Sequence, residues 1–429
     1  MSQFDHRNLA RLGLPALPLA FVALPLYVIW PHYFANQFGV SLGLIGAVLL
    51  LARLADALLD PALGLWIDKL LQRGSETLLR RTWLAGTFLS AGFLLLFFPN
   101  WLTGPSVTIE VLLLLVLAAL LVSYLCYSFL NIALQTWGAR LGGDAPMRSR
   151  LVGWREGLGL CGVILASLIP AWGGIPALVS GFVLLLGLSL WAWWYAPRPS
   201  DSHTVSPPES QAAWRSLLQP WGHAAFRRLL MVFMLNGIAS AVPATLMLFF
   251  IQDRLQLPSS MQTQFLGAYF LSAAISMPLW VMCMARFGLR RSWLAGMLLA
   301  VAVFIWTLGL GAGDEIAYTV VCLLSGLALG ADLIAPGALL NGLLQHQQSD
   351  EQHSGAFFGW WQVATKLNLA LAAGFSLPLL QWLGYASGSR DAPALLALSW
   401  AYALLPCILK LLAAAVLYFS AKTLQNWES

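Results

Sequence analysis

Charged residues are scarce in this sequence. They make up 10% of its 429 residues, whereas hydrophobic residues make up 59%. A soluble globular domain carries about a quarter of charged residues, because its surface must stay in contact with water. The composition therefore excludes a soluble enzyme and indicates an integral membrane protein. The formal net charge of +5 does not require a nucleic-acid partner.

Cysteine is also rare. The five cysteines all fall within apolar stretches, and none has the spacing of a metal-binding pair; they are Cys126, Cys161, Cys283, Cys322 and Cys407. We interpret them as small packing residues and predict neither a disulfide nor a cofactor.

Long apolar runs, by contrast, are abundant. Twelve of them are each long enough to cross a hydrocarbon core about 30 Å thick, which predicts an all-α polytopic membrane protein with twelve transmembrane helices. Hydropathy and turn residues place the spans at residues 14–36, 42–67, 82–99, 106–137, 150–172, 174–196, 229–252, 262–285, 292–312, 315–345, 354–386 and 394–421. The first run lacks a convincing cleavage site, so we expect a retained span and not a signal peptide.

Basic residues outside the spans are distributed unevenly. If the N-terminus is cytoplasmic, 17 of the 23 basic residues lie in cytoplasmic segments, and only Arg254 and Arg390 lie outside. Translocation of basic loops is disfavoured. The asymmetry therefore predicts that both termini are cytoplasmic, in a membrane that we expect to be a bacterial inner membrane.

The chain also shows an internal repeat. The sequence Leu-Arg-Arg-Thr-Trp-Leu-Ala-Gly at 79–86 recurs with one change at 289–296, where the third span of each half begins. We predict a six-helix half at residues 1–196, a Pro- and Ser-rich cytoplasmic linker at 197–227, and a second six-helix half at 228–429. This arrangement resembles major-facilitator transporters, whose substrate site lies near the midplane between two repeats.

Eight charged residues remain inside the predicted spans, and the two signs are equal in number. They are Arg53, Arg155, Lys366, Lys410, Asp56, Asp60, Glu156 and Asp332. Each costs roughly 2.5–3.5 kcal/mol or more near a helix centre unless it meets a partner or water. We therefore treat these positions as candidates for function.

Arg53, Asp56 and Asp60 share one face of the second span, because their spacing is i, i+3 and i+7. Two carboxylates one turn apart provide hard oxygen ligands for a small cation, or a site for a proton. The alternative is a structural salt bridge between Arg53 and one acid. We expect Asp68, beside Lys69 in the following loop, to be only a surface residue.

Polar residues also line three later spans. In the fourth span, Tyr127, Asn131 and Gln135 lie on one face that could hydrogen-bond a cation shell or substrate hydroxyls, and interhelical bonding is the equal alternative. We expect Trp154 and Arg155 of the fifth span, and Trp361, Gln362 and Lys366 of the eleventh, to contribute to substrate binding or coupling, with Arg155 able to pair with the second span. Asp332 and Lys410 could simply pair with each other.

The residues from Arg53 through Pro61, followed by Gly64, Asp68 and the Arg80-Arg81 pair, resemble the second-span signature of the glycoside–pentoside–hexuronide:cation symporter family. The fourth, fifth and eleventh spans are similar to that family more loosely. The resemblance implies a sodium-, lithium- or proton-coupled symporter. It implies that Asp56 and Asp60 are cation ligands, and that Arg155 and Lys366 lie near the substrate and coupling site.

Two departures from the family pattern shape our expectation of the coupling ion. Sugar-transporting relatives carry a third acid where this chain has Asn131, and an aromatic residue where it has Gln135; residues 14–36 also contain no acid. With two acids left, a proton is favoured over a sodium ion at Asp56 and Asp60, with Asn131 beside them.

We therefore predict a monomeric, proton-coupled importer of a small organic solute such as a sugar or glycoside. A lysolipid or other amphiphile transporter on the same fold is the main alternative, because the fold also includes lysophospholipid transporters. An exporter is a third possibility, since Pro170 to Gly174 faintly resembles the end of an antiporter motif. A membrane-embedded enzyme is the alternative outside transport, and the sequence offers no catalytic constellation that would support it.

Overall fold

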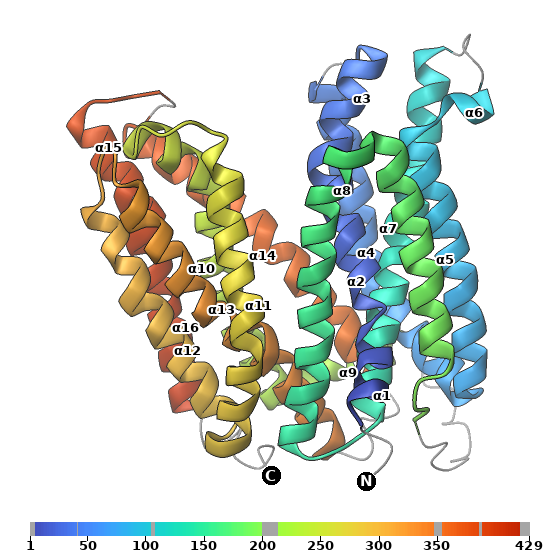
Figure 1. The fold of residues 1–429 in the computed structure, drawn as a ribbon. Coiled ribbons are helices and arrows are strands. Elements are labelled where there is room, and N and C mark those ends of the chain that lie inside the picture. The colour runs from blue at the N-terminus through green and yellow to red at the C-terminus, as the bar shows by residue number, and fades with distance from the viewer. Residues whose placement is uncertain are drawn as a thin grey trace. The chain divides into compact units, whose positions relative to one another are not determined.

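The computed structural model describes residues 5–40, 42–103, 108–199, 213–346, 354–385 and 388–420. All regular elements in these ranges are helical (Figure 1). Residues 200–212 of the predicted linker lie outside the described residues, whereas its later part forms helix α9.

The helices of the first part of the chain are α1 (His6–Gly13), α2 (Ala16–Leu24), η2 (Pro25–Ile29), α3 (Trp30–Phe38), α4 (Leu42–Gln72), α5 (Ser75–Phe97), α6 (Asn100–Thr103), α7 (Ile109–Arg140), α8 (Ala145–Trp194) and α9 (Ala213–Gly222). Those of the later part are α10 (Ala224–Phe249), η3 (Phe250–Arg254), α11 (Met261–Phe287), α12 (Leu289–Phe304), η4 (Ile305–Gly309), α13 (Glu315–His346), α14 (Ser354–Trp382), α15 (Ala392–Ser399), η6 (Trp400–Leu404) and α16 (Leu405–Phe419).

The twelve predicted spans each coincide with a helix or a run of helices. Nine helical segments of the described chain are long and apolar enough to cross a membrane. Helices are the expected solution, because lipid offers no hydrogen-bond partners to the backbone. The fifth and sixth spans form α8, which is bent at Gly174, where φ is 64°; Figure 1 draws its two arms meeting at a turn. A left-handed φ of this kind favours glycine.

The helices are grouped into two compact units. The first unit comprises Met1–Gly142, Trp154–Pro220 and Gln347–Val363, and the second comprises Gly143–Gly153, Trp221–His346 and Ala364–Ser429. The start of the fifth predicted span thus belongs with the second unit, and the start of the eleventh with the first. The division at 196 and 228 made from the sequence stays a prediction.

The internal repeat is matched by equivalent packing inside each unit. In the first unit, α7 packs against α4 and α5, and in the second unit α13 packs in the same way against α11 and α12. Each helix that contains the repeated octapeptide, α5 or α12, therefore lies against the fourth span of its own half.

The core of the second unit includes a ring cluster near η3 and η6. Phe250 stacks on Tyr402 with ring centroids 4.1 Å apart, and Tyr318 packs edge-on against Phe265. Nearby, the Tyr385 hydroxyl donates to the carboxylate of Asp253 and so ties the loop after α14 to η3. Burial, followed by this bond to Asp253, raises the pKa of Tyr385 well above its ordinary value.

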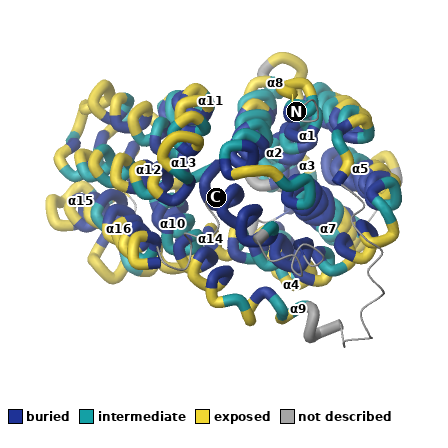
Figure 2. Tube along the Cα trace, turned by 90° about the horizontal axis from the view of Figure 1, so that it is seen from below, coloured by how far each residue is buried: buried dark blue, intermediate teal, exposed yellow. Residues whose placement is uncertain are grey.

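Large apolar side chains cover much of the outer surface. Leu58, Trp172 and Ile316 are each at least 80% exposed, and Figure 2 shows exposed residues on the outer sides of helices whose other sides are buried. A soluble protein rarely exposes apolar patches of this extent. The surface fits a hydrocarbon environment and supports an integral, multi-pass membrane protein.

Candidate functional site

The two acids of α4 are buried inside the first unit. Asp56 is 3% exposed and Asp60 is 0% exposed. The Ser128 hydroxyl of α7 donates to Asp56 Oδ1 over 2.9 Å. Neither carboxylate faces lipid, as expected from the cost of a charge in hydrocarbon.

Tyr127 of α7 lies among the acids of two helices. Its hydroxyl hydrogen-bonds to Asn131, and the charges of Asp56, Asp60 and Glu156 all act on it. Three carboxylates, from α4 and α8, therefore act electrostatically on one tyrosine within the first unit. The two buried ones, Asp56 and Asp60, can attract a small cation or a proton.

Arg53 is the basic member of the α4 face. It is exposed, and its charge acts on the Tyr124 hydroxyl of α7. The predicted polar stripe of Arg53, Asp56 and Asp60 thus meets α7 at Tyr124, Tyr127 and Ser128.

Arg155 pairs differently from our expectation. Among the described residues, its ion pair is the 2.7 Å salt bridge with Glu156, the next residue of α8, and not one with an acid of α4. The reason is local: the neighbouring carboxylate satisfies the guanidinium without a partner from another helix. Trp154 packs at the same point, with its ring edge-on to His6 of α1.

Asn131 and Gln135 bond to each other. The Gln135 amide donates to Asn131 Oδ1 over 2.9 Å, and Gln135 is buried. Since Tyr127 also bonds to Asn131, the polar face predicted on the fourth span is a connected chain of three side chains on α7.

Asp68 is not the surface residue that we expected. It is 2% exposed and accepts hydrogen bonds from Arg140 of α7 and from the backbone N–H groups of Gly355 and Ala356. A carboxylate at a helix N-terminus satisfies backbone donors that have no partner within the helix. Asp68 therefore holds the first turn of α14 against α4 and α7.

Glycines bring α14 into backbone contact with α4. A Cβ on Gly64 would overlap the carbonyl oxygen of Gly355, and a Cβ on Gly359 would lie 2.7 Å from the carbonyl oxygen of Asp60. Small residues four apart permit such close helix packing in membranes. One of these contacts is at Asp60 itself, so the candidate cation site and α14 share a backbone interface.

The remaining predicted residues of the eleventh span lie on α14. Trp361 and Gln362 are buried, at 6% and 5% exposure, and belong to the first unit. Lys366 is partly buried and belongs to the second unit. In the second unit, Lys410 Nζ and Asp332 Oδ2 are 2.7 Å apart, so the pairing suggested for these two residues is confirmed.

Sequence reasoning left Ser128 and Asp68 out of the site. Ser128 gives no signal of its own, because a serine in a span is unremarkable. For Asp68 a signal existed: it lies one helical turn after Gly64, and Gly355 and Gly359 are four residues apart in the eleventh span, a spacing of small residues that predicts close helix packing.

A family model described as MFS/sugar transport protein matches residues 12–421, nearly the whole chain. The chain belongs to this family. It is the family of glycoside–pentoside–hexuronide:cation symporters within the major facilitator superfamily, as the second-span residues predicted. As a member of the MFS/sugar transport protein family, the protein is a transporter and not an enzyme.

Individual relatives of this MFS transporter are distant. It is 24% identical over 199 residues to the sodium-dependent lysophosphatidylcholine symporter 1 of Gallus gallus, covering 45% of this chain and 37% of that protein. It is 24% identical over 277 residues to the glycoside/cation symporter YagG of Escherichia coli (strain K12), covering 62% of this chain and 58% of YagG. The matches thus span less than two thirds of each relative's length.

Solved structures share the fold of this MFS transporter over nearly its full length. A bacterial homologue of the iron transporter ferroportin in its outward-facing state has a TM-score of 0.75 at 15% identity, covering 98% of this chain and 100% of that one. The transporter FucP in its outward conformation has a TM-score of 0.70 at 15% identity, covering 96% and 97%. These likenesses confirm the predicted major-facilitator fold.

Proposed function

We propose that this protein is a proton-coupled symporter that imports a small organic solute by alternating access. Asp56 and Asp60 bind the coupling cation, with Tyr127 and Asn131 beside them. Arg53, Gln135, Trp154, Arg155, Trp361, Gln362 and Lys366 serve substrate binding or coupling. Both termini are cytoplasmic, and the membrane is a bacterial inner membrane.

One observation carries this proposal: two carboxylates, one helical turn apart on α4, are buried at 3% and 0% exposure. Burying a carboxylate is costly unless it is compensated. An arriving cation or proton compensates the charge, which ties the energy of the ion gradient to the conformation of the helices that bury the acids.

The contacts of α14 suggest how an event at the acids is transmitted. Gly359 packs against the backbone of Asp60, and Asp68 caps the first turn of α14. A shift of α4 when Asp60 gains a cation therefore reaches α14 directly. Lys366 lies two turns beyond Gly359 on the same face of α14, because seven residues make about two helical turns.

Lys366→Ala should leave expression and folding largely intact but remove concentrative uptake. An ionisable side chain within a span is a candidate functional residue by default. Uptake against a gradient in proteoliposomes is the measurement, and Arg286→Ala, at an exposed site, is the control. Transport by Lys366→Ala at the wild-type rate would show that the lysine is only structural.

A lysolipid or other amphiphile is the second candidate substrate. Similarity to the sodium-dependent lysophosphatidylcholine symporters of Gallus gallus and Danio rerio favours it, whereas similarity to the glycoside/cation symporter YagG favours a glycoside. Similarity to the two lysophosphatidylcholine symporters also favours sodium as the coupling ion, because both are sodium-dependent. The neutral Asn131 favours a proton instead.

Uptake by purified protein in liposomes tests both questions. A panel of glycosides and lysolipids is offered under an imposed proton gradient and, separately, under a sodium gradient at constant pH. We expect accumulation of one class, driven by protons and falling as external pH rises, because fewer protons are then available to the acids. Uptake that needs sodium and ignores the proton gradient would contradict proton coupling. If neither gradient drives uptake of any compound in the panel, symport is contradicted.

A further inference from the structure

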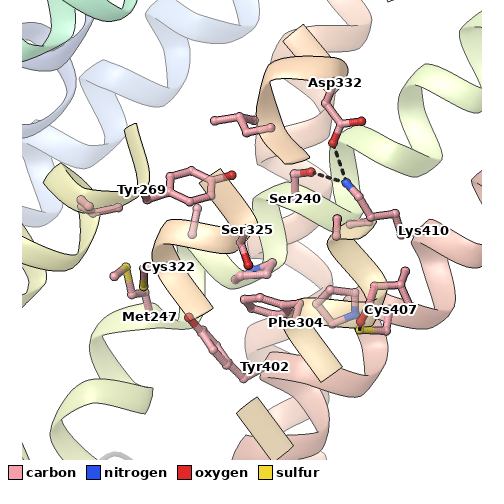
Figure 3. Close-up of a pocket in the computed structure, with 18 of the residues that line it drawn as sticks. Ser240, Met247, Tyr269, Phe304, Cys322, Ser325, Asp332, Tyr402, Cys407 and Lys410 are labelled. Atoms are coloured by element: carbon pink, nitrogen blue, oxygen red, sulfur yellow. Dashed lines mark hydrogen bonds and ion pairs between the residues drawn. The ribbon is translucent and has the colours of Figure 1, made fainter. Parts of the chain in front are cut away.

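The second unit contains a cavity of about 150 Å³. It lies among α10, α11, α12, α13, η6 and α16 (Figure 3). Most of its wall is apolar, from side chains such as Met247, Leu266 and Phe304. An apolar cavity of about this size holds a benzene molecule. The cavity therefore has room for an aromatic ring or a short aliphatic chain.

A buried ion pair forms the polar part of the wall. Lys410 Nζ donates to Asp332 Oδ2 over 2.7 Å and to Ser240 Oγ over 3.3 Å, and Trp293 donates to Asp332 Oδ1 over 2.9 Å. The side chains of Lys410 and Asp332 are 10% and 8% exposed. Both carboxylate oxygens thus already accept a hydrogen bond.

The hydrogen-bonding capacity left over consists of one charged donor and two hydroxyl groups. Lys410 has three N–H groups and uses two of them for Asp332 and Ser240. The buried Ser325 hydroxyl has no hydrogen-bond partner among the described residues. Tyr269 also lines the cavity, and its hydroxyl lies on the side of the ring that faces Ser240 in Figure 3. A ligand that complements these groups must offer an acceptor to the charged donor, Lys410.

We propose that this cavity binds a small amphiphilic carboxylate. The carboxylate of the ligand replaces that of Asp332 on Lys410, and the apolar body of the ligand fills the space beside Met247 and Phe304. A carboxylate is favoured because the lysine already holds one in this geometry. The proposal assigns a second ligand and a second proton site to the symporter, and in that respect it rests on the function proposed above.

The exchange balances when one proton enters with each ligand. Before binding, the ammonium of Lys410 neutralises Asp332. Afterwards it neutralises the ligand, and Asp332 would be a buried charge without its ammonium. Asp332 therefore takes up a proton, so that one anion and one proton are bound together and the net charge of the site stays at zero.

The surroundings contain no other charge that could take either role. Among the described residues that line the cavity, Lys410 and Asp332 are the charged ones. The neighbouring helices contribute neutral groups, Ser240 from α10 and Trp293 from α12. The other titratable side chains of the lining are Tyr269, Tyr318, Cys322, Tyr402 and Cys407.

The internal repeat supports a role specific to the second half. Trp293 occupies the same place in its octapeptide as Trp83 does in the first copy. Trp293 is buried and donates to Asp332, whereas Trp83 is 36% exposed. The hydrogen bond to Asp332 is thus a feature of the second copy of the octapeptide.

Binding of phenylacetate to the purified full chain tests the proposal by titration calorimetry at about pH 6, 7 and 8, where the free acid is ionised. Phenylethanol serves as the uncharged analogue of similar size. We expect the Kd of phenylacetate to rise about tenfold per pH unit, since one proton is linked to each ligand. Phenylethanol should bind at least about tenfold more weakly at pH 6, because it cannot pair with the lysine.

Five variants separate the roles. Asp332→Asn should keep phenylacetate binding but lose its pH dependence. Lys410→Gln should weaken binding by at least about tenfold, as expected for loss of a charged hydrogen-bond donor. Ser325→Leu, which fills the cavity and leaves both charges in place, should also weaken it. Trp293→Phe is compared with Trp83→Phe, and only the former should change the affinity.

Equal affinity for phenylacetate and phenylethanol, or wild-type affinity in Lys410→Gln or Ser325→Leu, would overturn the proposal. So would the absence of phenylacetate binding to the wild type. These outcomes are independent of the proposed symport. Asp56→Asn should no longer couple uptake to a gradient, but it should still bind phenylacetate with wild-type affinity and wild-type pH dependence.

Discussion

Asp60→Asn should abolish uptake against a gradient and leave the protein folded. Asn has the same shape as Asp but cannot exchange a proton or neutralise a cation. Position 60 is fully buried, so a neutral side chain of the same shape packs there without the cost of burying a charge. In proteoliposomes with an imposed proton gradient, accumulation should fall to the level of protein-free liposomes. Exchange of labelled for unlabelled solute at equal concentrations should persist.

Asp56→Asn should also abolish uptake against a gradient. It should leave the protein folded, because the amide oxygen of the asparagine can still accept the hydrogen bond from Ser128. Glu76→Gln is the matched control. It makes the same carboxylate-to-amide change at an exposed salt bridge with Arg80, where such a bond contributes about 0–1 kcal/mol. Gradient-driven accumulation by Asp60→Asn at the wild-type level would show that the buried acids do not couple transport.

Gly64→Ala should release the first turns of α14 from α4. The added methyl group would overlap the carbonyl oxygen of Gly355, and neither backbone can move without disturbing the hydrogen bonds from Gly355 and Ala356 to Asp68. Overpacking of this kind costs about 1–3 kcal/mol. We therefore expect a lower melting temperature and a large loss of transport.

Gly46→Ala is the control on the same helix, because no atom lies within 4 Å of the position of its Cβ. There the change should stabilise the helix by up to about 1 kcal/mol, from helix propensity. Hydrogen–deuterium exchange is the local readout: a peptide covering Ser354–Trp360 should exchange faster in Gly64→Ala and unchanged in Gly46→Ala. If Gly64→Ala has the hydrogen-exchange rate and the melting temperature of the wild type, the close packing of α4 and α14 is contradicted.

The fold could be predicted well from the sequence. Each of the twelve predicted spans coincides with helix, with boundaries displaced by a few residues. This success has a local cause. A run of about 20 apolar residues in lipid must satisfy its own backbone hydrogen bonds, and a helix does so without help from distant residues.

The site could be predicted only in part. The spacing of Asp56 and Asp60 along α4 was sufficient to place them on one face, and their cost in lipid was sufficient to predict their burial. Their partners Tyr127 and Ser128 come from α7, and Glu156 comes from α8. Which residues of one helix meet those of another depends on helix rotation and register, which periodicity does not encode.

By itself, then, the sequence determined the helical spans, the membrane setting, the family and the two acids of α4, because each depends on local hydropathy, spacing or a contiguous motif. Only the tertiary structure decided that Asp68 is a buried cap of α14, that Arg155 pairs with Glu156, and that Asp332 and Lys410 line a cavity. These pairings join residues up to 288 positions apart. They form because a buried polar group takes whichever partner the packed helices bring within reach.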